Sequence, residues 1–424
     1  MLSLTDYQAH AWGEDWTPAF AAAIDALCAQ GGGTLTVPAG LYRAYGIRLY
    51  SNITLHLEAG AVLRFFEGPD GFALIDMEFE GITEPAYEPL LWARDAKNVR
   101  ITGAGTLDGN GAQWWQAVRE KTLQHPRPYL VFFDRCEDVV LEGVTLLNSP
   151  CWTVHPMACE NVSVRGIAIH NPWDSPNTDG INPNRSRNVR ISDCLIDVGD
   201  DCIAIKSGTE DTKDATPCEN ILISNCQMLN GHGGVVIGSE MSGGVRNVVV
   251  TGCVFQGTDR GIRVKTRRRR GGRIENLLFS HILMDRVMCP FVFNMYYFCG
   301  KDGKMRHVWD KAAYPVDAGT PGIFDVRIES VTATNATACA GFVYGLAEMP
   351  VTRLSLSDVT VTMRPGQPDR PAMMDDLPDM EARGFYLRNG RDIVLRNVRV
   401  VDAVGAAIDQ ENVTGELYEG SNQR

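Results

Sequence analysis

The stretch Asn188-Val189-Arg190-Ile191-Ser192-Asp193-Cys194-Leu195-Ile196 contains the pattern that decides the fold. A polar residue starts the pattern, an apolar residue follows, and further apolar residues stand three, six and eight places after the start. The pattern recurs at intervals of roughly 23 to 32 residues, which is typical of repeat architectures. Each copy predicts one coil; the copies start at Asp138, Asn161, Asn188, Asn220, Asn247 and Asn276, and then more loosely at Asp325, Arg353 and Asp392.

The apolar positions keep their character from copy to copy. Because residues two apart on a strand share a face, the spacing indicates β-strands with the same positions pointing inward in every coil. Cysteines recur at the sixth place, where they are typical of a stacked ladder of small core residues. The columns at plus three, plus six and plus eight read Leu141, Val164, Ile191, Ile223, Val250 and Phe279; Val144, Ile167, Cys194, Cys226, Cys253 and Ile282; and Leu146, Ile169, Ile196, Met228, Phe255 and Met284.

Parallel strands from successive coils, spaced about 4.8 Å apart, predict an all-β, single-stranded right-handed parallel β-helix. Asn at the coil starts suits tight turns, because it tolerates the left-handed region. Thr17 as N-cap with Pro18 in the first turn predicts a helix that runs to about Gln30 and caps the N-terminal end of the cylinder. We expect one domain over 1–424, with a cap region at 1–45 and coils at 46–424.

The composition excludes several classes of protein. The chain has 424 residues, of which 44% are hydrophobic and 22% charged, so it can bury a core. Its net charge of -12 argues against nucleic acid or an anionic membrane as the partner. The first twenty residues show neither a basic nor an apolar segment of a signal peptide, and no later stretch could span a membrane, which predicts a soluble, cytoplasmic protein. The 12 cysteines include no CxxC pair, so neither disulfides nor a zinc site is favoured.

Charged residues recur in the same register beyond the core columns. Twelve residues after three successive starts lie Asp200, His232 and Asp259, and eighteen after the same starts lie Lys206, Gly238 and Lys265. Because the intervening apolar residues alternate inward, one sheet is predicted to present a charged face to solvent.

A longer turn at 171–175 would bring the preceding coil into the same register. Asp179-Gly180-Ile181 then lies over Asp201-Cys202-Ile203, which makes Asp179 and Asp201 neighbours on adjacent strands, with Asp200 beside them. Stacked aspartates repel one another unless a function requires them. The arrangement therefore indicates a site and not a structural feature.

Four short motifs on consecutive coils resemble the signatures of glycoside hydrolase family 28, the polygalacturonases and their relatives, which have a pectin lyase-like β-helix. The resemblance covers essentially the whole chain. Val264 replaces the more usual isoleucine, and the phrase from Gly238 to Gly244 resembles bacterial exo-acting members. The motifs are Asn177-Thr178-Asp179-Gly180, Gly199-Asp200-Asp201, Gly231-His232-Gly233 and Arg263-Val264-Lys265.

The resemblance implies a role for each aspartate. Asp200 would protonate the leaving glycosidic oxygen, while Asp179 and Asp201 would activate the attacking water. Hydrolysis through an oxocarbenium-like state needs one protonated and one ionised carboxyl group, and repulsion among three carboxyls keeps one proton bound. We expect Asp200 to lie in a turn. Family members invert, so we expect a carboxyl separation of roughly 6.5 to 9.5 Å, with Asp200 further away than the Asp179/Asp201 pair.

The same resemblance implies that Arg263 and Lys265 hold a substrate carboxylate, for which a guanidinium fork and an ammonium are suited. His232 would orient the acid or bond a sugar hydroxyl. No cofactor and no metal are expected.

Further candidates for substrate binding each have a structural alternative. Asn177 contacts substrate or caps the turn that holds Asp179, and Lys206 belongs to the charged column. Arg267 opens the run Arg267–Arg270, which forms either a solvated turn or an electrostatic funnel for an acidic oligomer. Tyr296, with its neighbour Tyr297, forms a sugar-stacking platform or packs at a coil edge.

Several functions remain open at this point. The leading hypothesis is an exo-acting hydrolase that cleaves α-1,4-galacturonosidic bonds in acidic oligosaccharides, with the insertion 302–319 closing one end of its cleft. The alternatives are a rhamnogalacturonan-directed hydrolase, a calcium-dependent β-eliminating pectate lyase and a non-catalytic carbohydrate-binding β-helix. The sequence leaves the oligomeric state open.

Overall fold

The structure is a computed structural model that describes residues 1–298, 300, 302–366 and 368–417. The chain divides into two compact units, Met1–Asp201 and Cys202–Arg424. Both consist of coils of a right-handed parallel β-helix, which confirms the predicted fold class. The expectation of one domain over 1–424 stays a prediction. Among the described residues, no helix has the length and apolar character that a membrane crossing requires.

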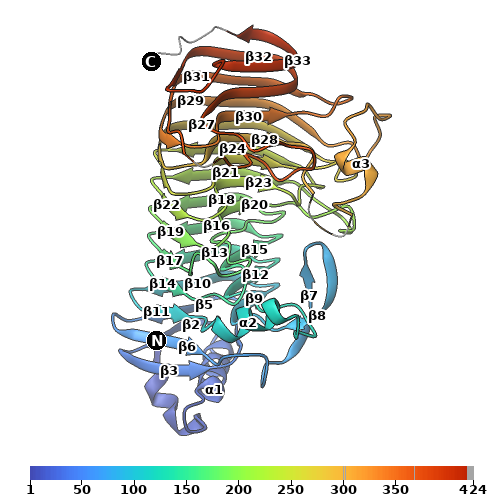
Figure 1. The fold of residues 1–424 in the computed structure, drawn as a ribbon. Helices are drawn as coiled ribbons and strands as arrows, with labels where there is room; N and C mark the ends of the chain where they lie inside the picture. The colour runs from blue at the N-terminus through green and yellow to red at the C-terminus, as the bar shows by residue number, and fades with distance from the viewer. Residues whose placement is uncertain (299, 301, 367, 418–424) are drawn as a thin grey trace. The chain divides into compact units, whose positions relative to one another are not determined.

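The first unit opens with a helical cap and continues as stacked strands (Figure 1). Its elements are β1 (Leu2–Ser3), η1 (Leu4–His10), α1 (Thr17–Ala29), β2 (Gly33–Val37), β3 (Gly40–Ala44), β4 (Ile47–Leu49), β5 (Ile53–Leu57), β6 (Ala61–Phe65), β7 (Leu74–Phe79), β8 (Ile82–Tyr87), β9 (Leu91–Arg94), β10 (Lys97–Gly103), β11 (Thr106–Asp108), α2 (Ala112–Glu120), β12 (Val131–Asp134), β13 (Glu137–Glu142), β14 (Thr145–Leu147), β15 (Val154–Met157), β16 (Glu160–Arg165), β17 (Ala168–His170), β18 (Arg187–Ser192) and β19 (Leu195–Val198).

The second unit begins at Cys202, within β20 (Asp201–Ile205). Its other elements are β21 (Cys218–Ser224), β22 (Gln227–Asn230), β23 (Gly233–Gly238), β24 (Val245–Thr251), β25 (Val254–Gln256), β26 (Arg260–Lys265), β27 (Arg273–Asp285), β28 (Cys289–Asn294), α3 (Arg306–Trp309), β29 (Gly322–Ala336), β30 (Cys339–Tyr344), β31 (Val351–Met363), β32 (Arg383–Val401) and β33 (Ile408–Leu417).

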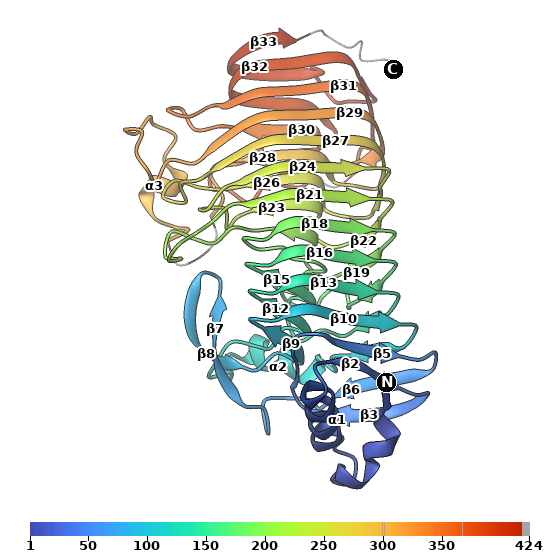
Figure 2. The same ribbon diagram turned by 180° about the vertical axis from the view of Figure 1, so that it is seen from behind.

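The predicted columns are rungs of the parallel sheets. In the first unit, β10, β13, β16 and β18 lie side by side (Figure 2), and Leu141 pairs with Val164, which pairs with Ile191. In the second unit, Val250 pairs with Ile223 on one side and Phe279 on the other. The cysteines of the sixth place are buried as expected, and in every coil the same positions face inward.

The coil starts adopt the left-handed conformation that the asparagines suggested. Their φ angles lie between 53° and 58°, a region that Asn and Asp enter at little cost. Their side chains also form ladders: Asn188 donates to Asn161 at 3.2 Å, and Asn276 donates to Asn247 at 2.8 Å. A polar residue at each start therefore permits the bend and bonds the next coil.

Helix α1 caps the apolar core of the first unit, as predicted. It buries Phe20, Ile24 and Leu27. Its start differs from the expectation, because the N-cap is Trp16 and Thr17 is the first helical residue. The Oδ1 atom of Asp15, one residue before the N-cap, accepts the N–H of Thr17 at 2.8 Å. The Asp15 carboxylate therefore does what the side chain of an N-cap residue usually does.

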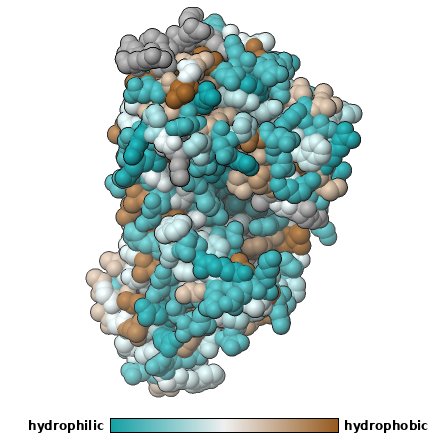
Figure 3. Space-filling model, viewed as in Figure 1, coloured by the Kyte–Doolittle hydropathy of each residue, from teal (hydrophilic) through white to brown (hydrophobic). Residues whose placement is uncertain are grey.

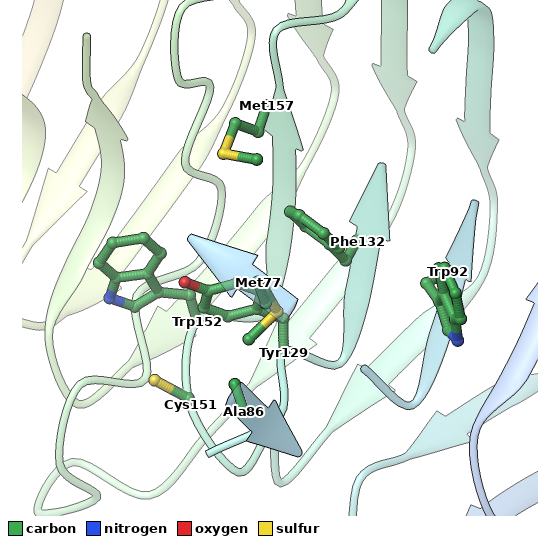
Figure 4. Close-up of a cluster of buried hydrophobic side chains, with 8 residues drawn as sticks. All are labelled: Met77, Ala86, Trp92, Tyr129, Phe132, Cys151, Trp152 and Met157. Carbon is green, nitrogen blue, oxygen red and sulfur yellow. The ribbon is translucent and has the colours of Figure 1, made fainter. Parts of the chain in front are cut away.

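The antiparallel hairpin β7–β8 was not predicted from the sequence. Met77 and Ala86 from this hairpin pack into a buried cluster with Tyr129, Phe132 and Trp152 (Figure 4). Arg185 ties the hairpin to a later coil through two hydrogen bonds to Glu78, at 2.9 and 2.8 Å. Hydrophilic residues predominate on the face shown in Figure 3.

Candidate active site

Three aspartates form a cluster in the first unit. Asp179, Asp200 and Asp201 each place a carboxylate oxygen so that the three oxygens lie within 4.8 Å of one another. Asp179 and Asp201 are buried, whereas Asp200 is half-buried. The Gly180 N–H donates to the Asp201 carbonyl at 3.0 Å, so the two segments are rung neighbours as the register predicted.

One oxygen of each carboxyl lies within 4.8 Å of an oxygen of the other two, which is closer than the expected carboxyl separation of roughly 6.5 to 9.5 Å. The reason is local. Asp200 lies in a bend before β20, as expected, and its Oδ1 accepts the Asp201 N–H at 2.9 Å, which turns the carboxylate back toward the strand. That Asp200 is the most distant of the three stays a prediction.

Asp179 is positioned by an asparagine that the sequence reasoning missed. Asn182 is fully buried, and its Nδ2 donates to Oδ2 of Asp179 at 3.0 Å, while its own Oδ1 has no partner. His155 in turn contacts Asn182, with its Nδ1 atom 2.8 Å from the Asn182 carbonyl oxygen. Because Asn182 stands three residues after Asp179, outside the motif, only its burial in the fold reveals it.

The glycine before the aspartate pair leaves no room for a side chain. A Cβ atom on Gly199 would lie 2.5 Å from the carbonyl oxygen of Ser175 and 2.7 Å from that of Pro172. The Gly199 N–H also donates to Oγ1 of Thr178 at 3.3 Å. The bend that carries Asp200 is therefore packed directly against the loop that carries Asp179.

Asn177 takes part in the turn before Asp179 through its backbone conformation and a side-chain bond to an arginine. Its φ is 54°, in the left-handed region, and its Oδ1 accepts a hydrogen bond from Arg127 at 2.7 Å. The buried Arg127 also donates to the carbonyl oxygens of Pro150 and Pro176, both at 2.7 Å. One guanidinium thus fixes the loop that leads into Asp179.

In the second unit, His232 lies in a bend before β23, in the same place in its coil that Asp200 has in its own. Its Nδ1 lies 2.8 Å from Oδ2 of Asp259, the next residue of the same column. Burial works to raise the pKa of Asp259, but the hydrogen bond from His232 and the charges of Arg260 and Arg263 outweigh it and lower that pKa. Asp259 therefore stays ionised and fixes the orientation of the imidazole.

Arg263 and Lys265 lie on β26 with their side chains over one aromatic ring. The guanidinium carbon of Arg263 is 5.6 Å and the Lys265 Nζ is 5.2 Å from the centre of the Tyr297 ring. Both basic residues are largely buried, at 3% and 6% exposure, which strengthens their attraction for an anion that reaches them. The pair has the composition of a carboxylate-binding site.

Two weaker candidates, Lys206 and Tyr296, occupy buried surroundings. Lys206 lies 3.4 Å from Oε1 of Glu240, and both side chains are buried. Tyr296 is fully buried against Tyr344 and under the charges of Arg268 and Lys311, which matches its packing alternative.

Three of the four arginines in the run are buried, so Arg267 belongs neither to a solvated turn nor to a funnel, and both interpretations of this residue are corrected. Arg267 is 2% exposed and donates to Glu210 at 2.6 Å; Arg270 contacts the other oxygen of the same carboxylate. Arg268 is paired with Glu348 in a bidentate contact. The two acidic partners come from loops far away in the sequence, so all three arginines are bound to carboxylates inside the protein.

The comparisons with known proteins agree with the motifs. A model of the glycosyl hydrolases family 28 matches residues 75–372. A probable polygalacturonase from Vitis vinifera is 34% identical over 81% of this chain and 70% of its own length. Three other curated plant relatives are matched over only 42% to 55% of their lengths.

Solved structures show the same fold. A hyperthermoactive exopolygalacturonase from Thermotoga maritima superimposes with a TM-score of 0.79 at 31% identity, covering 94% of this chain and 91% of that one. A family 28 exopolygalacturonase from Yersinia enterocolitica gives 0.80 at 20% identity, over 100% of this chain and 79% of that one, which indicates the fold alone.

Proposed function

Because the chain belongs to the glycosyl hydrolases family 28 and is a polygalacturonase-like hydrolase of pectin, we propose that it cleaves α-1,4-galacturonosidic bonds and releases galacturonic acid from one end of an oligogalacturonide. The observation that carries the proposal is the cluster of Asp179, Asp200 and Asp201, with carboxylate oxygens within 4.8 Å. Exo action is supported by the similarity to the Thermotoga maritima exopolygalacturonase.

In this proposal Asp200 is the general acid. It is the most exposed of the three carboxyls and lies in a bend, where a leaving glycosidic oxygen can reach it. Asp179 and Asp201 are buried and share the task of base toward the attacking water. Repulsion among three close carboxyls favours retention of one proton, which the acid needs.

The substrate is held by its charge. Arg263 and Lys265 present a guanidinium and an ammonium to a uronate carboxylate, and the ring of Tyr297 limits the positions that their side chains can take. His232, oriented by Asp259, bonds a sugar hydroxyl. Lys206 adds a further positive charge close in sequence to Asp201, partly offset by Glu240.

A time course on defined oligogalacturonides and rhamnogalacturonan oligomers, resolved by mass, tests the proposed specificity. We expect monomer alone from the first time point with galacturonate trimers to hexamers. Products of several intermediate lengths would show endo attack. Turnover of the rhamnogalacturonan oligomers alone would show that the enzyme is specific for rhamnogalacturonan.

Replacing the acid tests its role. Asp200→Asn should lower kcat by on the order of 10² to 10⁴, the usual contribution of general acid–base catalysis. Asp25→Asn, on the exposed face of α1, is the matched control and should retain full activity. Full activity in Asp200→Asn would refute the assignment.

The stereochemistry distinguishes two uses of the same carboxyls. We propose inversion, with the water activated by the Asp179/Asp201 pair, although a separation near 5 Å is also the usual geometry of retaining enzymes. Proton NMR of the first product should show the anomer opposite to that of the substrate. Retention of the anomeric configuration would show instead that one carboxylate of the Asp179/Asp201 pair acts as a nucleophile.

A further inference from the structure

A segment between β31 and β32 packs against the basic pair. Residues 368–382, here called the strap, are closed on themselves by an antiparallel bridge between Asp369 and Met380, with backbone hydrogen bonds of 3.0 and 2.8 Å. Met374 inside the strap is fully buried. The strap is therefore a fixed part of the second unit, although no repeat pattern predicts it.

Two residues next to the basic pair hold the strap by its backbone. Arg260, at the start of β26, donates to the carbonyl oxygen of Pro371 at 3.0 Å and to that of Arg370 at 2.9 Å. Asn294, at the end of β28, donates to the carbonyl oxygen of Met373 at 3.1 Å. These contacts place Met373 with little freedom of its backbone.

The side chain of Met373 reaches Arg263. The Nη2 atom of Arg263 donates to the Met373 sulfur at 3.4 Å, while the Nη1 atom donates to the His232 carbonyl oxygen at 3.4 Å. Arg263 is 3% exposed, but Met373 is 36% exposed, so the thioether covers the guanidinium from the solvent side. A thioether is a weak, uncharged acceptor, so it occupies a donor without adding a negative charge.

We propose that Met373 is a specificity-determining positioning residue: the strap holds its uncharged sulfur against Arg263, where it positions the guanidinium without adding a carboxylate that would compete with that of the substrate. The inference rests on the proposed function, in which Arg263 binds a uronate. A carboxylate side chain at position 373 would instead form a charge-assisted bond to Arg263 and compete with the substrate.

Two variants of equal length test this inference. Met373→Glu and Met373→Gln place the same number of heavy atoms beside Arg263 and differ only in charge. With an oligogalacturonide, we expect Met373→Glu to raise KM about tenfold or more, the size of one charge-assisted hydrogen bond, with kcat nearly unchanged. Met373→Gln should stay within about twofold of the parent KM, because a neutral acceptor remains.

The charge effect has two further signatures that a packing defect would not show. The KM difference between the Glu and Gln variants should shrink as pH falls through the pKa of the new carboxylate, which the Arg263 guanidinium would hold below the usual value of about 4.3. The same KM difference should vanish with a methyl-esterified oligomer, because that oligomer has no carboxylate with which the new glutamate could compete. Met373→Leu, which keeps the apolar volume, serves as a third variant in case either polar variant fails to fold, and should raise KM modestly, by about two- to fivefold.

The outcomes separate this inference from the proposed function. Equal KM values for the Glu and Gln variants, an effect confined to kcat, or an unchanged KM in Met373→Leu if that variant alone folds, would overturn the role of Met373 while leaving the hydrolase intact. A parent enzyme that turns over no galacturonate oligomer would instead overturn the proposed function.

Discussion

Gly199 determines where Asp200 can lie, because its Cα faces the loop that carries Asp179. A Cβ atom would meet backbone oxygens at 2.5 and 2.7 Å, which no real side chain tolerates. One of the two segments would have to move, and with it the separation of the carboxyls. The position is thus an example of a residue whose importance comes from what surrounds it and not from its own chemistry.

We predict that Gly199→Ala destabilises the protein by about 1–3 kcal/mol, the usual cost of an overpacked site, and lowers kcat at least tenfold through the displaced carboxyls. Denaturant titration and initial rates measure the two effects. Gly366→Ala is the control, because a Cβ there meets nothing within 4 Å. Equal behaviour of the two variants would contradict the argument.

The His232–Asp259 contact predicts a pH dependence. The folded pKa of Asp259 lies below its unfolded value of about 3.9, so the ionised form stabilises the protein above that pH, and the contribution is lost as pH falls through the folded pKa. Asp259→Asn should therefore be destabilising at pH 7, and the difference from the parent should shrink below about pH 4.

Urea titrations of parent and variant at pH 7 and pH 3.5 measure this difference. The same substitution should lower kcat/KM, because the imidazole of His232 loses the acceptor that orients it. A stability difference that grows in acid would show that Asp259 is not held in its ionised form.

At the scale of elements, one guanidinium joins two irregular segments of the second unit. Arg268 pairs with Glu348 at 2.6 and 2.9 Å, and it also donates to the carbonyl oxygens of His307, Asp310 and Ala312 at 2.9, 2.7 and 2.9 Å. The insertion around α3, the proposed wall of an exo-acting cleft, is thereby fastened to the turn after β30. Because Arg268 is buried, its positive charge needs the carboxylate of Glu348.

We expect Glu348→Gln to cost about 3–5 kcal/mol, because it leaves the buried Arg268 without a carboxylate. The double change Arg268→Met with Glu348→Leu removes both charges, but it also withdraws the donors of three carbonyl oxygens, so it should cost as much as the single change or more. Urea unfolding of the three proteins tests the ordering. If the Glu348→Gln variant is as stable as the parent, the Arg268–Glu348 ion pair does not contribute to the free energy of unfolding.

At the scale of the whole molecule, family membership separates hydrolysis from elimination. Paired carboxyls supply the acid and base of hydrolysis, whereas β-elimination needs a cation to acidify the α-proton. We expect activity to survive a chelator and the products to lack the ultraviolet absorbance of unsaturated ends. Loss of turnover in EDTA with recovery on adding calcium would favour the lyase alternative.

Much of this fold could be predicted because a parallel β-helix repeats a local rule. An inward apolar position in one coil lies over the same position in the next, so the columns at plus three and plus eight correspond to the rungs of the structure. The left-handed coil starts could be predicted for the same reason, since Asn and Asp tolerate that conformation. The predicted cytoplasmic location and the single domain stay predictions.

The sequence by itself determined the coils, the cap and the meeting of Asp179 with Asp201, because each follows from spacing along the chain. Only the tertiary structure decided the burial of Arg267, the support of Asp179 by Asn182 and the contact of Met373 with Arg263. These contacts join coils to loops of irregular length, or depend on which way a side chain turns at a bend. The repeat does not specify the partners of these side chains. They follow from the packed interior, where a buried charge is stable only beside a partner.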